Sequence, residues 1–245
     1  MNSYKIIKYT SEHYQMWNNF VAQAKNATFL FHRDFMEYHS DRFEDYSLLV
    51  FDEKENLKAI FPANISENKL FSHHGLTYGG IVIDASLKLE KFIAIYAEIL
   101  HFLNENKIQI INFKLIPSIY CSQPSEEIKY ALFLSEAKLA RRDALVTIDL
   151  QSQFKIDSNR IEGVKRAEKL GLKIIKEKDF TGFWNTVLIP NLEAKHEAKP
   201  VHNLAEIQTL QEKFSENIIQ YNVYQGDEIV AGTTLFVDKK TVHVQ

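Results

Sequence analysis

The chain has 245 residues, of which 45% are hydrophobic and 25% charged, so it can bury one or two ordinary cores and fits neither the disordered nor the fibrous class. Its formal net charge of −3 supplies no overall positive field to hold a nucleic-acid backbone. The single cysteine, Cys121, cannot form an internal disulfide, which indicates a reducing, cytoplasmic location. The sequence shows no signal-peptide layout and no apolar run near the roughly 20 residues of a membrane span.

Hydrophobic periodicity predicts mixed helices and strands in the first 150 residues. In chain order these are a strand at residues 4–8, helices at 11–24 and 34–39, strands at 46–51, 57–65, 69–71 and 77–83, a helix at 86–104, a strand at 108–116, a helix at 125–139 and a strand at 145–150. The polar turn at 52–56 joins two of these strands into a hairpin. The strand at 108–116 is almost continuously apolar, so we expect it at the centre of a sheet.

The remaining residues predict a second set of elements. They are a basic helix at 158–170 followed by Gly171, a strand at 172–176, helices at 180–197 and 204–214, and strands at 218–224, 228–237 and 241–245. The last strand would be an exposed edge with unpaired backbone groups, which favours self-association with another chain.

An internal repeat links the two sets. VFDEKENLKAIFPANISENKLF at residues 50–71 and VYQGDEIVAGTTLFVDKKTVHV at 223–244 share the layout strand, polar turn, strand with an interior alanine, polar turn, strand. An amphipathic helix precedes each copy. We therefore expect two equivalent antiparallel hairpins, although any two β-meanders can look alike. The first unit would span residues 1–150 and the second residues 151–245.

Four segments carry a family resemblance: FLFHRDFMEYH at residues 29–39, FSHHGLTYGG at 71–80, PSEEIKYALFLSEAKLARRD at 124–143 and KPVHNLAEI at 199–207. With the order of elements, they resemble bacterial proteins of the FemAB-like branch of the GNAT (acyl-CoA N-acyltransferase) superfamily. The resemblance implies an α/β fold of tandem GNAT-like units. The second unit lacks the elements that follow residue 83 in the first, so we expect it to be incomplete and the chain to be a fragment.

This resemblance implies a cytoplasmic acyltransferase that moves an acyl group to an amine of a small-molecule or cell-wall-precursor-like acceptor. The donor would be acyl-CoA, a loosely bound co-substrate, or less plausibly aminoacyl-tRNA, given the net charge of −3. The GNAT pyrophosphate loop, Q/R-x-x-G-x-G/A, does not occur among the eight glycines, and RIEGVK at residues 160–165 fails at its last position. A catalytically inactive ligand- or protein-binding module is therefore the alternative.

Two groups of residues are candidate substrate ligands. In the basic helix, Arg160, Lys165 and Arg166 match a Fem segment that contacts a phosphorylated substrate, although the same letters describe an exposed helix face. In the first unit, backbone next to glycines can approach a ligand closely, and imidazole can act as base or donor. The candidates there are His73, His74 and Tyr78, joined by His32 and Arg33. We expect His73, His74 and Tyr78 to line the same cleft as at least one of Arg160, Lys165 and Arg166.

A third candidate group lies at the end of the helix predicted at 180–197 and just after it. A substrate could be anchored there by His196, Lys199 and His202, or these residues could simply mark a solvated helix end before a turn. Glu193 and His196 form one E-x-x-H pair, but di-metal bundles need a second copy, so we expect no metal site. The residue that accepts the amine proton is not indicated by the sequence.

Overall fold

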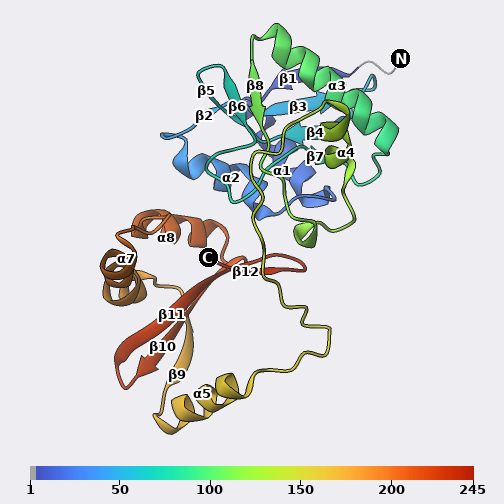
Figure 1. The fold of residues 1–245 in the computed structure, drawn as a ribbon. Coiled ribbons are helices and arrows are strands. Elements are labelled where there is room, and N and C mark those ends of the chain that lie inside the picture. Colours follow the sequence, from blue (N-terminus) through green and yellow to red (C-terminus); the bar gives the residue numbers. More distant parts are fainter. Residues whose placement is uncertain (1–3) are drawn as a thin grey trace. The chain divides into compact units, whose positions relative to one another are not determined.

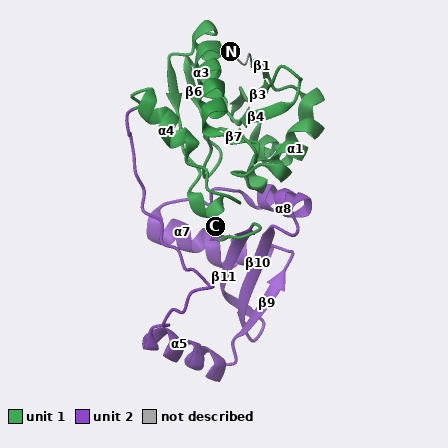
Figure 2. Cartoon of the chain, turned by 90° about the vertical axis from the view of Figure 1, so that its right-hand side faces the viewer, with its two compact units in different colours: residues 1–137, 238–242 green, residues 138–237, 243–245 purple. Residues whose placement is uncertain are grey.

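The computed structural model describes residues 4–245 and divides into two compact units (Figure 2). The first runs to Ala137 and also includes Asp238–Val242. The second contains Lys138–Val237 and His243–Gln245. The chain thus changes unit after Ala137, whereas the repeat suggested a division after residue 150. Both units mix helices with antiparallel strands, as the sequence predicts (Figure 1).

Unit 1 contains two four-stranded sheets. One sheet has the order β1-β3-β4-β7, with bounds Lys5–Lys8, Leu48–Phe51, Leu57–Phe61 and Val82–Ile83. The other has the order β2-β5-β6-β8, with bounds Glu44–Asp45, Asn64–Ser66, Lys69–Phe71 and Ile110–Asn112. The strand predicted at 57–65 is divided into β4 and β5 at Pro62, because proline cannot donate a backbone hydrogen bond. The predicted hairpin is confirmed, since β3 and β4 pair antiparallel.

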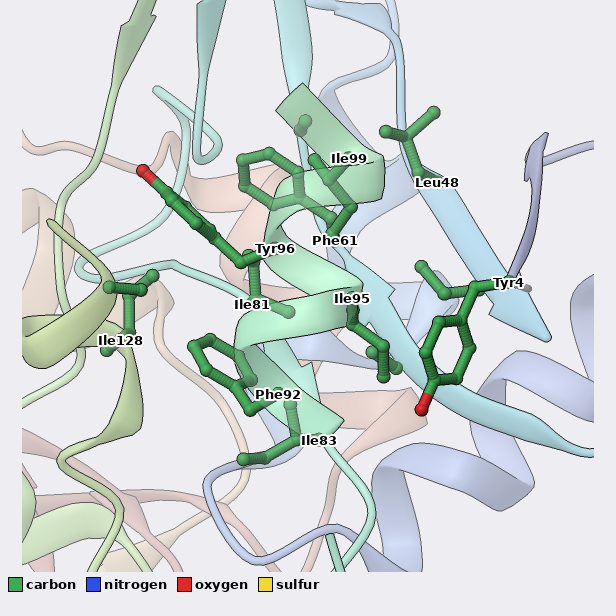
Figure 3. Packing of buried hydrophobic residues seen from close by; sticks show 14 of the residues in the cluster. Tyr4, Leu48, Phe61, Ile81, Ile83, Phe92, Ile95, Tyr96, Ile99 and Ile128 are labelled. Carbon is green, nitrogen blue, oxygen red and sulfur yellow. The ribbon is translucent and has the colours of Figure 1, made fainter. Parts of the chain in front are cut away.

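Helices connect these strands and cover them. Those of unit 1 are α1 (Tyr14–Gln23), α2 (Arg33–Met36), α3 (Leu89–Glu105) and α4 (Glu127–Leu134), with 3-10 turns η1 (Ser11–His13), η2 (Phe29–Phe31), η3 (Glu37–His39) and η4 (Ser118–Tyr120). On α3 the buried residues Phe92, Ile95, Tyr96, Ile99 and Leu103 follow helical spacing and belong to the core cluster. Figure 3 shows the first four of them beside strand residues such as Phe61 and Ile83. Burying each such side chain contributes about 1.5–3 kcal/mol, so α3 anchors the core of unit 1.

The helix α3 leads from β7 in one sheet to β8 in the other. β8 pairs in parallel with β6, and an isolated parallel bridge joins Gly79 to Leu115 further along. The prediction that residues 108–116 form a central strand is therefore wrong, because β8 lies at an edge of its sheet. The segment is apolar because it packs on the core cluster through Ile108, Ile111, Phe113 and Leu115.

Unit 2 repeats the first part of this order. Its elements are α5 (Ser158–Lys169), β9 (Lys173–Glu177), α6 (Thr181–Phe183), η5 (Trp184–Leu188), α7 (Ile189–His196), α8 (Leu204–Lys213), β10 (Ile218–Gln225), β11 (Glu228–Val237) and β12 (Val242–Val244). The sheet order is β12-β11-β10-β9, and β10 pairs antiparallel with both β9 and β11. The second predicted hairpin is thus confirmed. As in unit 1, a strand and helices precede a hairpin whose first strand pairs with that initial strand.

Three further expectations are corrected. The helix at 125–139 ends at Leu134, because Glu136 adopts a positive φ of 53° that a helix cannot continue. The strand at 145–150 does not form, and Val146 is 97% exposed. The helix at 180–197 contains the five-residue π-helix η5. Pro190 follows it and has no N–H for an ordinary i→i−4 bond, which favours the wider turn.

Residues 238–242 complete unit 1 from the far end of the chain. Lys239 Nζ donates to the carbonyl of Ala22 at 3.1 Å, Lys240 Nζ to that of Ser122 at 2.8 Å, and the Thr241 hydroxyl to that of Ile119 at 2.9 Å. Ala22 lies in the last turn of α1, where the helix dipole favours a cation. Among the described residues, no helix has the length and apolar character needed to cross a bilayer.

Candidate functional site

The loop between β6 and β7 is closed at its neck. Ser72 N–H donates to Asn112 at 2.9 Å, and Gly79 N–H donates to Lys114 at 2.5 Å. A Cβ on Gly79 would lie far inside contact distance of the Ser72 carbonyl oxygen, so the two ends touch through backbone. Lys114 fastens the loop further: its N–H donates to the Ser72 hydroxyl at 2.7 Å and its Nζ to the Leu76 carbonyl at 2.6 Å. Residues 72–79, which we call the neck loop, are therefore held rigidly.

His73, the second residue of the neck loop, is buried. Its side chain is 3% exposed, and its backbone has a φ of 65°, which is uncommon for a residue other than glycine. The ring stacks on His39, with 5.2 Å between centroids, and lies 5.7 Å from Phe43. Its Nδ1 has no hydrogen-bond partner in the described structure. Burial, and then the charge of His39, lower the pKa of His73 to about 3, so the imidazole is neutral at physiological pH.

The two other candidates of this loop differ in exposure. His74 is exposed and stacks on Phe71 at 3.6 Å between ring centroids. Burial and then Lys114 lower the pKa of His74. Tyr78 is buried, and its hydroxyl shares a 2.9 Å hydrogen bond with that of Thr28. Desolvation raises the pKa of Tyr78 well above its ordinary value. Of the three predicted residues, only His74 is accessible to a substrate in this conformation.

Arg33 is occupied within the fold. Its side chain is buried, with Nε donating to Glu37 at 2.9 Å and Nη2 paired with Asp45. The guanidinium also lies 3.7 Å from the ring centroid of Tyr9. These ion pairs connect α2 to β2, so the charge of Arg33 is used within the fold and is not available to a substrate. Its neighbour His32 is partly exposed, with Nδ1 2.9 Å from the carboxylate of Asp34.

Asn26 occupies the edge of β7 that does not pair with β4. Its amide donates to the Ile81 carbonyl at 2.9 Å, and its side-chain oxygen accepts from Ile83 N–H at 2.9 Å. Lys25 N–H donates to the Ile83 carbonyl at 3.3 Å, and the Lys25 ammonium is paired with Glu127. Asn26 therefore takes the place of a neighbouring strand.

We expect Asn26→Ala to lower the free energy of unfolding by about 2 kcal/mol. The substitution leaves the buried carbonyl of Ile81 and N–H of Ile83 without their side-chain partner. Urea unfolding would measure it, with Asn19→Ala as control because the hydrogen bond of Asn19 is exposed. A midpoint equal to that of the control would contradict a strand-like role for Asn26.

Unit 2 carries a chain of buried polar side chains that sequence patterning did not reveal. Thr234 donates to Gln220 at 2.7 Å, and Gln220 donates to Asn222 at 2.7 Å. Asn222 then donates to the carboxylate of Glu177, which also accepts from Tyr224 at 2.7 Å. Gln220 and Asn222 are fully buried, although buried strand faces are usually apolar. Their i, i+2 spacing was the available signal, because such residues share one face of a strand.

The helix α6 and the π-helix η5 that follows it both contact β11 of this sheet. A Cβ on Gly232, which pairs with Asn222, would meet the ring of Phe183 in α6 at 2.6 Å. Trp184 is 4% exposed, and its Nε1 donor has no partner within the described structure. Beside η5, an open hollow of about 620 Å³ is lined by residues that include Thr186 and the acidic Asp227. Single-turn π-helices and unsatisfied buried donors are both frequent at functional sites.

The remaining candidates of unit 2 lie at its surface or in its core. Arg160, Lys165 and Arg166 are all exposed on α5. His196 and Lys199 are exposed near the end of α7, whereas His202 is buried with its ring 6.3 Å from that of Phe236. Because the loop histidines belong to unit 1 and these cations to unit 2, a joint site stays a prediction. Among the described residues, no group of three or more His, Cys, Asp or Glu side chains could hold a metal ion.

Comparisons with known proteins add little to this geometry. No protein-family model matches the sequence, and no curated protein matches it. Among solved structures, a similar chain is a fungal multi-domain GH3 β-N-acetylglucosaminidase described as containing a GCN5-related glucosamine N-acetyltransferase region. The TM-score is 0.38 at 14% identity, and the match covers 96% of this chain but 28% of the fungal one. At that TM-score the likeness assigns no activity here. The chain's own geometry establishes a mixed α/β protein whose two units share a strand order.

Proposed function

We propose that this protein takes part in N-acyl transfer of the FemAB-like GNAT type, from acyl-CoA, or secondarily aminoacyl-tRNA, to an amine. The supporting observation is the repeated order of strand, helices, antiparallel hairpin and third strand. In unit 1 this order continues through α3 into β8, which is parallel to β6. Helix connections between parallel strands follow a meander in this way in the GNAT-like units that the sequence resembles.

The proposed reaction asks little covalent chemistry of the protein. A thioester is already activated, so the chain must align the amine, accept its proton and stabilise the tetrahedral oxyanion. The exposed candidates suited to bind substrates are His74, Arg160, Lys165, Arg166, His196 and Lys199. The hollow beside η5 suits the acceptor, because the carboxylates of Asp227 and Glu228 on its lining attract a protonated amine.

The donor is proposed to bind unit 2. Asn26 fills the β7 edge in unit 1, so a donor there would have to break two hydrogen bonds of 2.9 Å. In unit 2, by contrast, Arg160 and Lys165 are exposed cations that can pair with phosphate groups. We therefore expect phosphate recognition on α5 rather than at the neck loop.

A second candidate function is a catalytically inactive module that binds a ligand or a protein. The filled edge of β7 favours it, and so does the lack of a Q/R-x-x-G-x-G/A motif in the 245 residues. Fold alone does not establish activity.

Calorimetric titration with acetyl-CoA and longer acyl-CoAs separates the two candidates. Acyl transfer predicts saturable binding that Arg160→Ala with Lys165→Ala weakens roughly tenfold, because charge-assisted hydrogen bonds to phosphate are lost. Lys88→Ala with Lys91→Ala is the matched control, since both lysines are exposed on unit 1. If no acyl-CoA binds, the donor assignment fails and the inactive module is supported.

A further inference from the structure

Residues 138–178, which we call the basic segment, differ in charge from the rest of the chain. They contain eleven Lys and Arg against six Asp and Glu, a net charge of +5. The other residues contain eighteen Lys and Arg against twenty-six Asp and Glu, a net charge of −8. An acidic protein therefore carries one distinctly cationic stretch. Such an asymmetry favours contact with an anionic partner through that stretch.

The basic segment also exposes an unusual amount of apolar surface. Of the 23 large hydrophobic side chains that are exposed in the part of the chain that the structure describes, twelve lie in this segment of 41 residues. They include Val146, Leu150 and Ile174, each more than two-thirds exposed. Single exposed apolar residues are ordinary, but such a concentration is typical of an interaction surface.

The helix α5 combines both properties. Ile161 and Val164 lie three residues apart, on the same side of the helix, and both are exposed. Arg166 lies on the opposite side of the helix, and Lys165 and Lys169 lie on the arc between Ile161 and Arg166. No residue of α5 is buried, and the helix lies apart from α7 and α8 of its own unit (Figures 1 and 2). A helix with an apolar side and a cationic side is suited to lie in the interface of a bilayer.

We propose that the basic segment docks on the surface of a bilayer that contains anionic lipids. Anionic headgroups attract its cations, while the acyl boundary accepts Ile161, Val164 and their exposed apolar neighbours. A symmetric dimer through this segment would bring one +5 segment against another. A nucleic-acid backbone would use the cations but leave the aliphatic side chains in water. A bilayer with anionic headgroups matches both the charge and the apolar surface.

The test is co-sedimentation of the whole protein with vesicles of phosphatidylcholine alone or of phosphatidylcholine with phosphatidylglycerol. We expect binding that needs the anionic lipid and weakens as salt is raised. Arg166→Glu with Lys169→Glu should reduce it at least tenfold, and Ile161→Ser with Val164→Ser should reduce it comparably. Lys88→Glu with Lys91→Glu makes the same change in net charge at exposed sites of unit 1 and should leave it unchanged.

Several results would overturn the proposal. Equal binding to both kinds of vesicle, or binding to neither, removes the anionic surface as the partner. If Lys88→Glu with Lys91→Glu weakens vesicle binding as much as the changes in α5 do, the binding depends on net charge and not on the basic segment. Dimerisation in analytical ultracentrifugation that Ile161→Ser with Val164→Ser abolishes would assign the apolar surface to a second copy. No acyl donor is present in these measurements, so their outcome is independent of the titration with acyl-CoA.

Discussion

Gly79→Ala is expected to destabilise unit 1 by about 4 kcal/mol or more, in the range of exceptional single substitutions. The new methyl group would overlap the backbone oxygen of Ser72 and lie 2.9 Å from its hydroxyl oxygen. A flexible side chain could move aside, but this oxygen belongs to the backbone of Ser72, whose N–H donates a hydrogen bond to Asn112 at the end of β8. The neck loop would have to open, and with it the pairing of Gly79 with Lys114.

The measurement is urea unfolding followed by circular dichroism, with Gly163→Ala as the matched control. Gly163 lies within α5 and a Cβ there meets no atom within 4 Å. Alanine at that position should stabilise the helix by up to about 1 kcal/mol. The two glycine-to-alanine variants are thus expected to change the free energy of unfolding in opposite directions. A Gly79→Ala protein as stable as the wild type would refute the closed neck.

Acidification is the second change with a large expected effect. The pKa of His73 falls from 6.5 to about 3 in the folded protein, because burial disfavours the charged ring. Between these two pH values, His73 is protonated in the unfolded chain but neutral in the folded protein. The contribution of neutral His73 to the free energy of unfolding is therefore intact above pH 6.5. It is lost as the pH falls, at up to about 1.4 kcal/mol per pH unit. At pH 4.5 the loss from His73 alone should reach roughly 2 to 3 kcal/mol.

His73→Asn isolates this group, since asparagine tolerates a positive φ and does not titrate. Unfolding free energies would be measured from pH 7.5 to 4.5. As the pH falls, the unfolding free energy of the variant should decrease less steeply than that of the wild type. The difference in slope should correspond to nearly one proton bound on unfolding. His74→Asn serves as control, because His74 is exposed. If wild type and His73→Asn lose stability in parallel, His73 is not the buried neutral group that the structure describes.

The pattern of apolar and polar residues predicted the elements that depend on local sequence. The two hairpins and α3 follow from alternating or helical spacing of apolar residues, and the structure contains all three. It could not predict the burial of Arg33, whose partner Asp45 lies 12 residues away. Nor could it predict Asn26, which completes a strand edge 55 residues away at Ile81. Such roles depend on which polar groups the fold brings together.

The same limit applies to the candidate sites. Gln220 and Asn222 alternate with Ile219 and Tyr221, and period-2 alternation alone predicts that the apolar side faces the core. The structure buries the amides instead, because Thr234 and Glu177 on neighbouring strands satisfy them. His73 was a candidate because of nearby glycines, but stacking on His39 places its ring inside the fold.

The hydrogen bond from Lys239 to Ala22 spans 217 residues of chain. During synthesis, the core of unit 1 leaves the ribosome long before residues 238–242 are made, and domains generally fold from the N-terminus as they emerge. Nascent unit 1 must therefore wait for its last contacts until the hairpin of unit 2 has been translated. In the finished protein, the contacts of Lys239, Lys240 and Thr241 join the part of unit 1 that is translated last to the part that is translated first.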